Sequence, residues 1–200
     1  MKTNFHDNEF LIQKMVYEVV PEHVPRPRSY SKSERILKMN SIDGKDFLDS
    51  EKKFTKQEAY NVVMEVLVAL YRIQKVYPTF KHNDLSVFNI MIENKTKTPV
   101  MIDFGLSVMK GIPNEQIPRL VKDAEVTDKP NRKYDAHLFL NSIFAHAKNP
   151  ELKKIAKYLL PAAYRKVEGK YVTYMRMRKN VSHTNFPTVR QLILNLIKYK

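Results

Sequence analysis

The amino-acid sequence predicts an α+β fold in which short strands come early and helices dominate afterwards. Three observations support this prediction. A first helical pattern precedes a proline-containing loop and a strand pattern, a capped amphipathic helix occupies the middle of the chain, and apolar helical patterns recur in the C-terminal part. With 43% hydrophobic and 28% charged residues, the 200-residue chain can bury a sizeable core.

The first fifty residues predict one helix and two short strands. Apolar residues recur at helical spacing from Asn8 to Val20, where a proline ends the pattern. The loop that follows predicts a short strand near Arg28–Ser31. A second strand is expected over Arg35–Ile42, with a turn at Asp43–Gly44 after it.

The longest predicted helix runs from Thr55 to Tyr77. Its start has the pattern of a capping box, in which the Thr55 hydroxyl and the Glu58 carboxylate satisfy backbone N–H groups. Two short apolar runs, Phe88–Ile92 and Val100–Ile102, then predict a β-hairpin with a polar connection. Further helices are expected over residues 135–147, 150–160 and 188–200.

The composition narrows the environments in which the protein can work. The absence of cysteine excludes disulfide bonds and thiolate metal sites. The first residues have no signal-peptide pattern, and the most apolar segment, residues 62–71, is far shorter than the ~20 residues that a membrane span needs. We therefore expect a soluble, intracellular protein with no membrane partner.

The charge balance is strongly basic, because 35 Lys and Arg residues oppose 21 Asp and Glu residues and leave a formal charge of +14. Such an excess attracts polyanions such as nucleic acid, ATP and acidic membrane surfaces. The basic residues are spread along the chain, and no nucleic-acid-binding motif accompanies them. Two interpretations therefore remain: the basic residues bind a nucleic-acid partner, or they simply cover solvated faces.

Three polar residues around the predicted hairpin form a candidate catalytic centre. Asp84 and Asn89 lie between the long helix and the first strand, and Asp103 follows the second strand. A hairpin brings Asp103 back beside Asn89, so that a carboxylate and an amide oxygen converge, as suits magnesium. Asp84 would then orient an acceptor hydroxyl and take its proton. Each residue alone is more often a cap or a turn former, but the three in this order favour chemistry.

The sequence around these residues resembles the protein-kinase family. His82–Asn89 is similar to the catalytic loop H-x-D-L-x-x-x-N, and Asp103–Gly105 reads D-F-G. The resemblance implies a kinase-like fold with ATP and Mg²⁺ as cofactors. It makes Asp84 the catalytic residue and Asn89 and Asp103 the metal ligands. The histidine and the phenylalanine of the two motifs would be packing residues that align the site.

The flanking segments agree with this register. Residues 35–48 resemble the last N-lobe strand, the hinge and the following helix of kinases, and Asp135 matches the buried acid that anchors the catalytic loop. The resemblance implies a nucleotide site with these members: Met39 as gatekeeper, backbone groups of Asn40 and Ile42, Asp46 at the ribose, Met91, and Glu9 of the Lys–Glu pair. Asp46 fits equally well as an acid at a helix N-terminus. Gln13, one turn after Glu9, argues against this role of Glu9, because the family packs an apolar residue at the position of Gln13.

The chain also departs from the family pattern. About eight residues precede the predicted first helix and reach under ~30 Å, too little for the three strands that carry the glycine-rich loop and the phosphate-binding lysine. No G-x-G-x-x-G sequence occurs. Asn83 replaces the usual arginine, Ser86 replaces the usual lysine, and no A-P-E sequence closes the activation segment.

These departures resemble compact atypical kinases. Asp84-Leu85-Ser86 is similar to the RIO kinases, and residues 102–107 are similar to the small kinase of the tRNA-modifying KEOPS complex. Short kinase-like proteins of large DNA viruses look similar too, which would put a viral protein of this kind in the host-cell cytoplasm. The resemblance implies a truncated N-lobe over residues 1–42 and a mainly helical C-lobe over residues 43–200, which contains the catalytic loop and the D-F-G hairpin.

Two functions from different classes fit these observations. The first is an ATP- and magnesium-dependent protein kinase directed at Ser or Thr of a protein substrate. The second is a catalytically impaired pseudokinase that binds or regulates a protein partner, because the glycine-rich loop and the phosphate-binding lysine are not found. A small-molecule kinase of the aminoglycoside or choline type and an RNA-associated role rank behind both.

Overall fold

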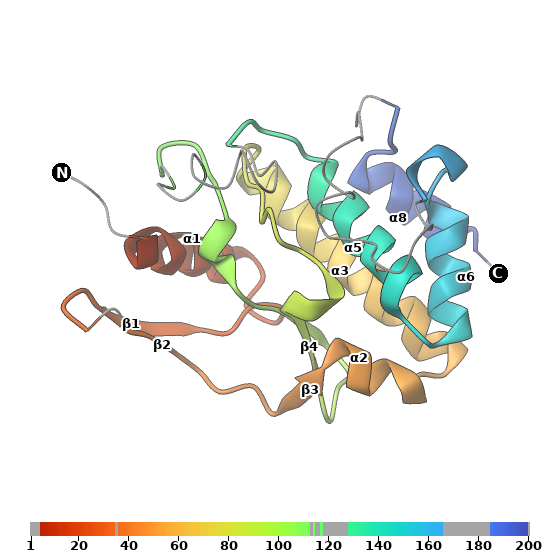
Figure 1. Ribbon diagram of the computed structural model, residues 1–200, viewed down its shortest axis with the longest axis horizontal. Helices are drawn as coiled ribbons and strands as arrows, with labels where there is room; N and C mark the ends of the chain where they lie inside the picture. The colour runs from red at the N-terminus through yellow and green to blue at the C-terminus, as the bar shows by residue number, and fades with distance from the viewer. Residues whose placement is uncertain are drawn as a thin grey trace.

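The N-terminal part of the structure is one helix packed on a two-stranded sheet (Figure 1). The computed structural model describes residues 5–34, 36–112, 114, 117, 128–165 and 185–199. Helix α1 spans Phe5–Val19, and strands β1 (Pro27–Ser31) and β2 (Ile36–Met39) pair antiparallel beside it. Ile12 and Val16 of α1 are completely buried, so this helix shares the core of the molecule.

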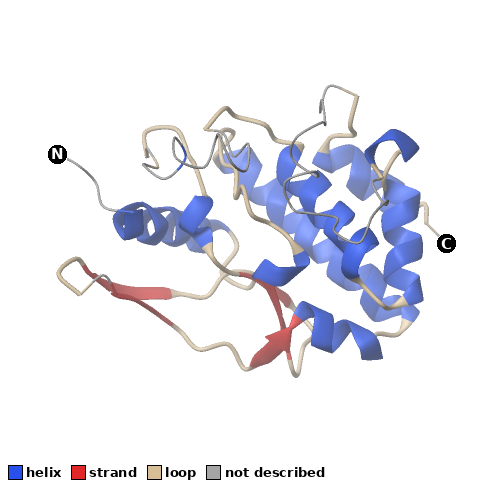
Figure 2. Cartoon of the chain, in the orientation of Figure 1, coloured by secondary structure: helices blue, strands red, loops and turns tan. Residues whose placement is uncertain are grey.

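A three-stranded antiparallel sheet joins this part to the helices (Figure 2). Its order is β3–β4–β5, with β3 at Gly44–Asp46, β4 at Ile90–Glu93 and β5 at Pro99–Met101. The sequence does not predict β3, because three residues carry too little alternation to be recognised. Glycine at position 44 permits the pairing, since a Cβ there would come within 2.5 Å of the Ile92 carbonyl oxygen.

The remainder of the described chain is helical and surrounds α3 (Lys56–Val76), which contacts α1, α6 and α8. Val63, Leu67 and Leu70 form part of a completely buried stripe on α3. The surrounding helices are α2 (Phe47–Ser50), α5 (Tyr134–His146), α6 (Pro150–Leu159) and α8 (Val189–Ile197). Short 3₁₀ turns are η1 (Glu51–Lys53), η2 (Val87–Asn89), η3 (Phe104–Leu106) and η4 (Ala162–Tyr164).

The structure confirms the α+β class and the predicted helices, which correspond to α1, α3, α5, α6 and α8 with small changes at their ends. The capping box at Thr55 is present with both of its hydrogen bonds. Among the described residues, no helix is long and apolar enough to cross a membrane. Residues 1–4 and 166–184 lie outside the described residues, and the lobe limits at 1–42 and 43–200 stay a prediction.

Two predicted strands are shorter than expected. The prediction for Arg35–Ile42 was wrong at its end, because β2 stops at Met39, whose partner in β1 is Pro27 at the start of that strand. Arg35 itself lies outside the described residues. The hairpin begins at Ile90 rather than Phe88, because residues 87–89 form the turn η2.

A buried carboxylate joins the turn before α3 to the start of α6. Glu51 is completely buried, and its carboxylate oxygens accept the N–H groups of Lys148 and Asn149 at 2.8 and 2.7 Å. The Asn149 amide donates in return to the carbonyls of Glu51 and Phe54, both at 2.9 Å. Because each oxygen has a donor, this buried charge is compensated. The network therefore ties the start of α6 to the segment before α3.

We expect Glu51→Ala to lower the free energy of unfolding by about 2–4 kcal/mol, because it leaves two buried N–H groups without acceptors. Urea denaturation at pH 7 measures the change. Glu18→Ala, an exposed position on α1, is the matched control and should change stability by less than about 0.5 kcal/mol. Equal losses in the two variants would contradict the role of Glu51.

Candidate active site

The candidate catalytic loop, residues 80–89, connects α3 to β4 and is held by helix α5. Asp135 is completely buried in the first turn of α5, and its two carboxylate oxygens accept the backbone N–H groups of His82 at 2.8 Å and Asn83 at 3.0 Å. The N–H of Val87 donates to the Ser142 hydroxyl of the same helix at 3.0 Å. Buried loop N–H groups need such partners, and hydrogen bonds to a carboxylate are strong ones. The structure confirms Asp135 as the anchor of the loop.

The catalytic loop is also tied to the segment that carries the D-F-G motif. Lys81 and Val108 exchange two backbone hydrogen bonds, at 3.0 and 2.9 Å. Asn83 Nδ2 donates to the Leu106 carbonyl at 2.9 Å. The His82 ring packs on the Phe104 ring, with 4.8 Å between centroids. The two motifs are therefore held together as one unit.

Asp84 and Asn89 lie side by side near the end of the loop. Asn89 Nδ2 donates to the Asp84 carbonyl at 2.8 Å and to Asp84 Oδ2 at 2.9 Å. The turn η2 makes this possible, because the Asn89 N–H donates to the Ser86 carbonyl at 3.0 Å. Since the amide nitrogen faces Asp84, Asn89 Oδ1 faces away from it and can act as an oxygen ligand.

Asp103 is brought beside Asn89 by the hairpin, as the sequence predicts. The N–H of Ile102 donates to the Asn89 carbonyl at 3.0 Å, so the next residue starts close to Asn89. Asp103 has a left-handed backbone with φ of 61°, and its Oδ1 accepts the Gly105 N–H at 3.2 Å. Such a conformation costs a non-glycine residue roughly 1–2 kcal/mol and tends to occur at functional sites. The Asp103 side chain is exposed and accessible to a ligand.

The oxygen atoms of this site suit a hard divalent cation. In the described part of the chain, no group of three or more His, Cys, Asp or Glu side chains can hold a metal. A cation here would therefore take one carboxylate from Asp103, one amide oxygen from Asn89, and water or phosphate oxygens. That ligand set fits Mg²⁺, which keeps several waters and shares phosphate oxygens.

His82 is a neutral packing residue in this site. Burial lowers its pKa from 6.5 to about 4, although the Asp103 carboxylate and the backbone of Ile102 raise the pKa in part. The ring is therefore uncharged at neutral pH and packs against Phe104 without introducing a buried charge.

The predicted adenine residues lie at the end of β2 and in the connection after it. Met39 is partly exposed, and its sulfur accepts from Gln13 Nε2 at 3.8 Å. The Asn40 N–H donates to the Arg26 carbonyl at 2.9 Å, so the protein already uses this group. Ile42 is half-buried two residues before β3. The structure thus leaves the hinge role of Met39, Asn40 and Ile42 a prediction, and it removes the Asn40 N–H from the groups that can serve adenine.

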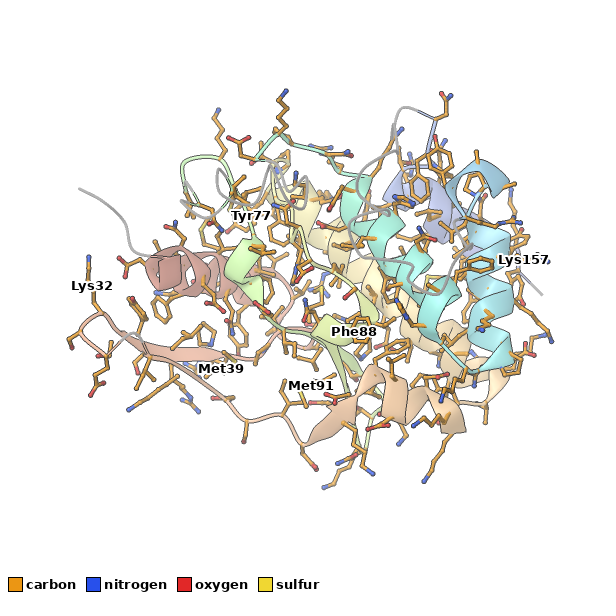
Figure 3. The ribbon with its side chains drawn as sticks, in the orientation of Figure 1. Lys32, Met39, Tyr77, Phe88, Met91 and Lys157 are labelled. Carbon is orange, nitrogen blue, oxygen red and sulfur yellow. The ribbon has the colours of Figure 1, made fainter. Side chains whose placement is uncertain are left out.

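Asp46 and Met91 face each other across the β3–β4 pairing. Figure 3 labels Met91 on this sheet and Met39 on the β1–β2 sheet. Asp46 is the residue before α2, yet its side chain makes no capping hydrogen bond and is exposed. A helix of four residues also has little dipole for an acid to stabilise. The helix-cap alternative for Asp46 therefore loses support relative to the ribose contact.

Glu9 lies half-buried on α1, and this helix packs against the turn η3 of the D-F-G segment. Gln13, one turn later, is buried, and its amide donates to the Pro25 carbonyl at 2.8 Å. A polar residue is thus accommodated where the family packs an apolar one, because it ties α1 to the segment before β1. The role of Glu9 in a Lys–Glu pair stays a prediction.

The sequence did not predict the structural roles of three residues that shape the site. Asn83 has φ of 67°, a backbone conformation in which asparagine is favoured over most residues, and its identity was a usable signal. Asn114 Nδ2 donates to the carbonyls of Gly105 and Ser107 at 2.9 and 3.1 Å. Lys81 is buried, and its ammonium lies 5.1 Å from the centre of the Tyr134 ring. No local pattern predicts the last two contacts.

We expect the free energy of unfolding to fall as the pH drops from about 6.5 to about 4, partly because His82 must be protonated in the unfolded chain and stays neutral in the folded one. Burial also lowers the pKa of His137, on α5, to about 4. Each histidine contributes up to roughly 3 kcal/mol to this loss.

Urea denaturation of His137→Phe and wild type at several pH values measures the contribution of His137. The two proteins share the same carboxylates, so the pH-dependent contribution of these groups cancels in the difference between the two free energies of unfolding. The free energy of unfolding of His137→Phe should rise relative to that of wild type as the pH falls. A difference that stays constant across this range would contradict a neutral buried His137.

The same segments can be compared with known proteins. A family model described as RIO domain matches residues 5–136, which include α1, both sheets, the catalytic loop and Asp135. No curated protein matches the sequence. Among solved structures, the kinase PK-1 of the Cydia pomonella granulovirus is similar, with a TM-score of 0.46 and 18% identity over 56% of this chain and 42% of that kinase. The chain thus spans less than half of the length of PK-1. The family model covers well over half of the chain, and the chain belongs to the RIO domain family of atypical protein kinases.

Proposed function

We propose that the chain is an ATP- and magnesium-dependent phosphotransferase of the protein-kinase type, directed at a Ser or Thr hydroxyl of a protein substrate. Members of the RIO family are generally ATP- and magnesium-dependent kinases, which supports the phosphotransferase part of the proposal. The observation that carries it is the hydrogen bond from Asn89 Nδ2 to Asp84 Oδ2, because it turns one carboxylate and one amide oxygen into a fixed pair.

In this proposal each polar residue has a defined task. Asn89 and Asp103 supply the oxygen ligands for Mg²⁺, which would neutralise charge on the phosphates of ATP. The Asp84 carboxylate orients the acceptor hydroxyl and takes its proton as the oxygen attacks the terminal phosphorus, while ADP leaves. The amide of Asn89 holds that carboxylate in position throughout.

Nucleotide contacts follow from the same register. Met39 and Met91 would contact the adenine ring, a carbonyl or N–H of the connection that contains Ile42 would bond its edge, and the exposed Asp46 would meet the ribose. Glu9 on α1 would take the position of the glutamate of the Lys–Glu pair. These assignments stay proposals until nucleotide binding is measured.

The second candidate is a kinase-like protein that binds or regulates a protein partner without catalysis. The chain has four glycines and no G-x-G-x-x-G sequence, so no glycine-rich loop is recognisable in it. Ser86, which stands where most Ser/Thr kinases have a lysine, is buried and does not offer a positive charge to a phosphate. Backbone donors of such a loop contribute strongly to phosphate sites, and their loss would weaken ATP binding.

We expect Asp84→Asn and Asp103→Asn each to lower magnesium-dependent phosphate transfer at least 100-fold, because one removes the base and the other a metal ligand. Asp49→Asn is the matched control, since Asp49 is an exposed carboxylate on α2 paired with Lys52. The measurement is transfer of labelled phosphate from ATP to a protein substrate or to the chain itself. Wild-type rates in both variants would refute the catalytic proposal.

Binding of ATP separates the two candidate functions. In the catalytic proposal Asp84→Asn still binds ATP with magnesium, whereas Asp103→Asn loses the magnesium-dependent part of the affinity. Calorimetric titration of the two variants measures this. A folded wild-type chain that binds no ATP at millimolar concentration would favour the partner-binding alternative.

A further inference from the structure

The C-terminal end of α3, the segment before α5 and the start of α8 lie at one side of the helical part (Figure 1). A cavity of about 800 Å³ is lined by residues of these three parts. None of the candidate catalytic residues lines this cavity. Its walls come from three parts of the chain that are far apart in sequence, so the cavity is a product of tertiary packing. A cavity between about 300 and 1,000 Å³ has the size of a site for a small molecule.

The charged residues among the described lining of this cavity are all basic. Lys75 comes from α3, Arg132 and Lys133 come from the segment before α5, and Arg190 comes from α8. The described residues that line the cavity include no Asp or Glu. Positive charges that converge from three elements repel one another, and an anion between them would relieve that repulsion.

The cavity also offers an apolar surface and exposed charged ends. Tyr71 and Pro130 belong to its lining, and Tyr71 is 39% exposed. Lys75, Arg132 and Arg190 are exposed as well. A ligand could therefore lay an apolar ring or chain against Tyr71 while its anionic groups reach the cations.

One wall of the cavity is fixed by hydrogen bonds to the base of the catalytic loop. Gln74 Nε2 donates to the Arg132 carbonyl at 3.0 Å, and Arg132 Nε donates to the Pro78 carbonyl at 3.1 Å. The buried Lys81 ammonium donates to the Lys129 carbonyl at 3.0 Å. An anion held here would contact the segment that leads into α5, the helix that anchors the catalytic loop.

We propose that this cavity binds a compact polyphosphate, meaning several phosphate groups on one small scaffold. Four basic residues line this one cavity, whereas an extended single strand of RNA needs a continuous basic groove. The formal charge of +14 favours anionic ligands in general, but it does not select this place. The proposal does not depend on phosphotransferase activity.

Calorimetric titration of the full chain with inositol hexakisphosphate tests this site. We expect one site per chain, and we expect Lys75→Ala/Arg190→Ala to weaken the affinity about tenfold or more, because two charge-assisted contacts are lost. Both side chains are exposed, and an unchanged melting temperature would show that the variant is folded.

The matched control is Lys153→Ala/Lys157→Ala, which removes the same charge from exposed positions on α6; Figure 3 labels Lys157 there. This variant should bind like wild type. Equal weakening in both pairs would mean that the phosphates respond to net charge, which overturns the proposal. Competition by magnesium–ATP that persists in Lys75→Ala/Arg190→Ala would put the anion in the nucleotide site, and tighter competing binding of a twelve-nucleotide RNA would assign the surface to nucleic acid. Either result would also overturn it.

Discussion

Two backbone N–H groups of the catalytic loop, those of His82 and Asn83, donate to the buried carboxylate of Asp135, and the rest of the candidate site is positioned relative to this contact. These two residues follow the single backbone pairing of Lys81 with Val108 and lie outside both sheets, so their buried N–H groups need another acceptor. A carboxylate with two oxygens satisfies both at once, and its helix is packed in the core. Asp84, directly after Asn83, therefore starts from a fixed backbone position.

The hairpin β4–β5 supplies the second half of the site. The turn η2 brings the Asn89 amide back to Asp84, and the backbone bond from Ile102 to Asn89 brings Asp103 beside it. Cross-links from Lys81 to Val108 and from Asn83 to Leu106 then hold the two motifs together. A rigid carboxylate–amide pair of this kind suits chemistry in which positioning contributes most of the rate.

Much of this arrangement could be predicted from local sequence. The capping box at Thr55, the apolar stripe of α3 and the hairpin are patterns within a few residues, so they are visible without the fold. The spacing of Asp84, Asn89 and Asp103 also predicted that the three lie close together, and hydrogen bonds from Asn89 to Asp84 and from Ile102 to Asn89 agree with it. Strand β3 could not be predicted in this way, because its pairing needs the close approach of Gly44 to β4.

The sequence by itself determined the order of elements and the chemical character of the site, because helical periodicity, caps and motif spacing are local properties. Only the tertiary structure decided which buried polar groups meet. Glu51 and Asn149 are far apart in sequence, as are Lys81 and Lys129, and each pair is explained by the need to satisfy buried donors and acceptors. The cationic cavity also joins residues that are far apart in sequence, since the packing of α3, α5 and α8 brings Lys75, Arg132 and Arg190 to one cavity. Charge composition could predict an attraction to anions, but three-dimensional packing was needed to show where the positive charges gather.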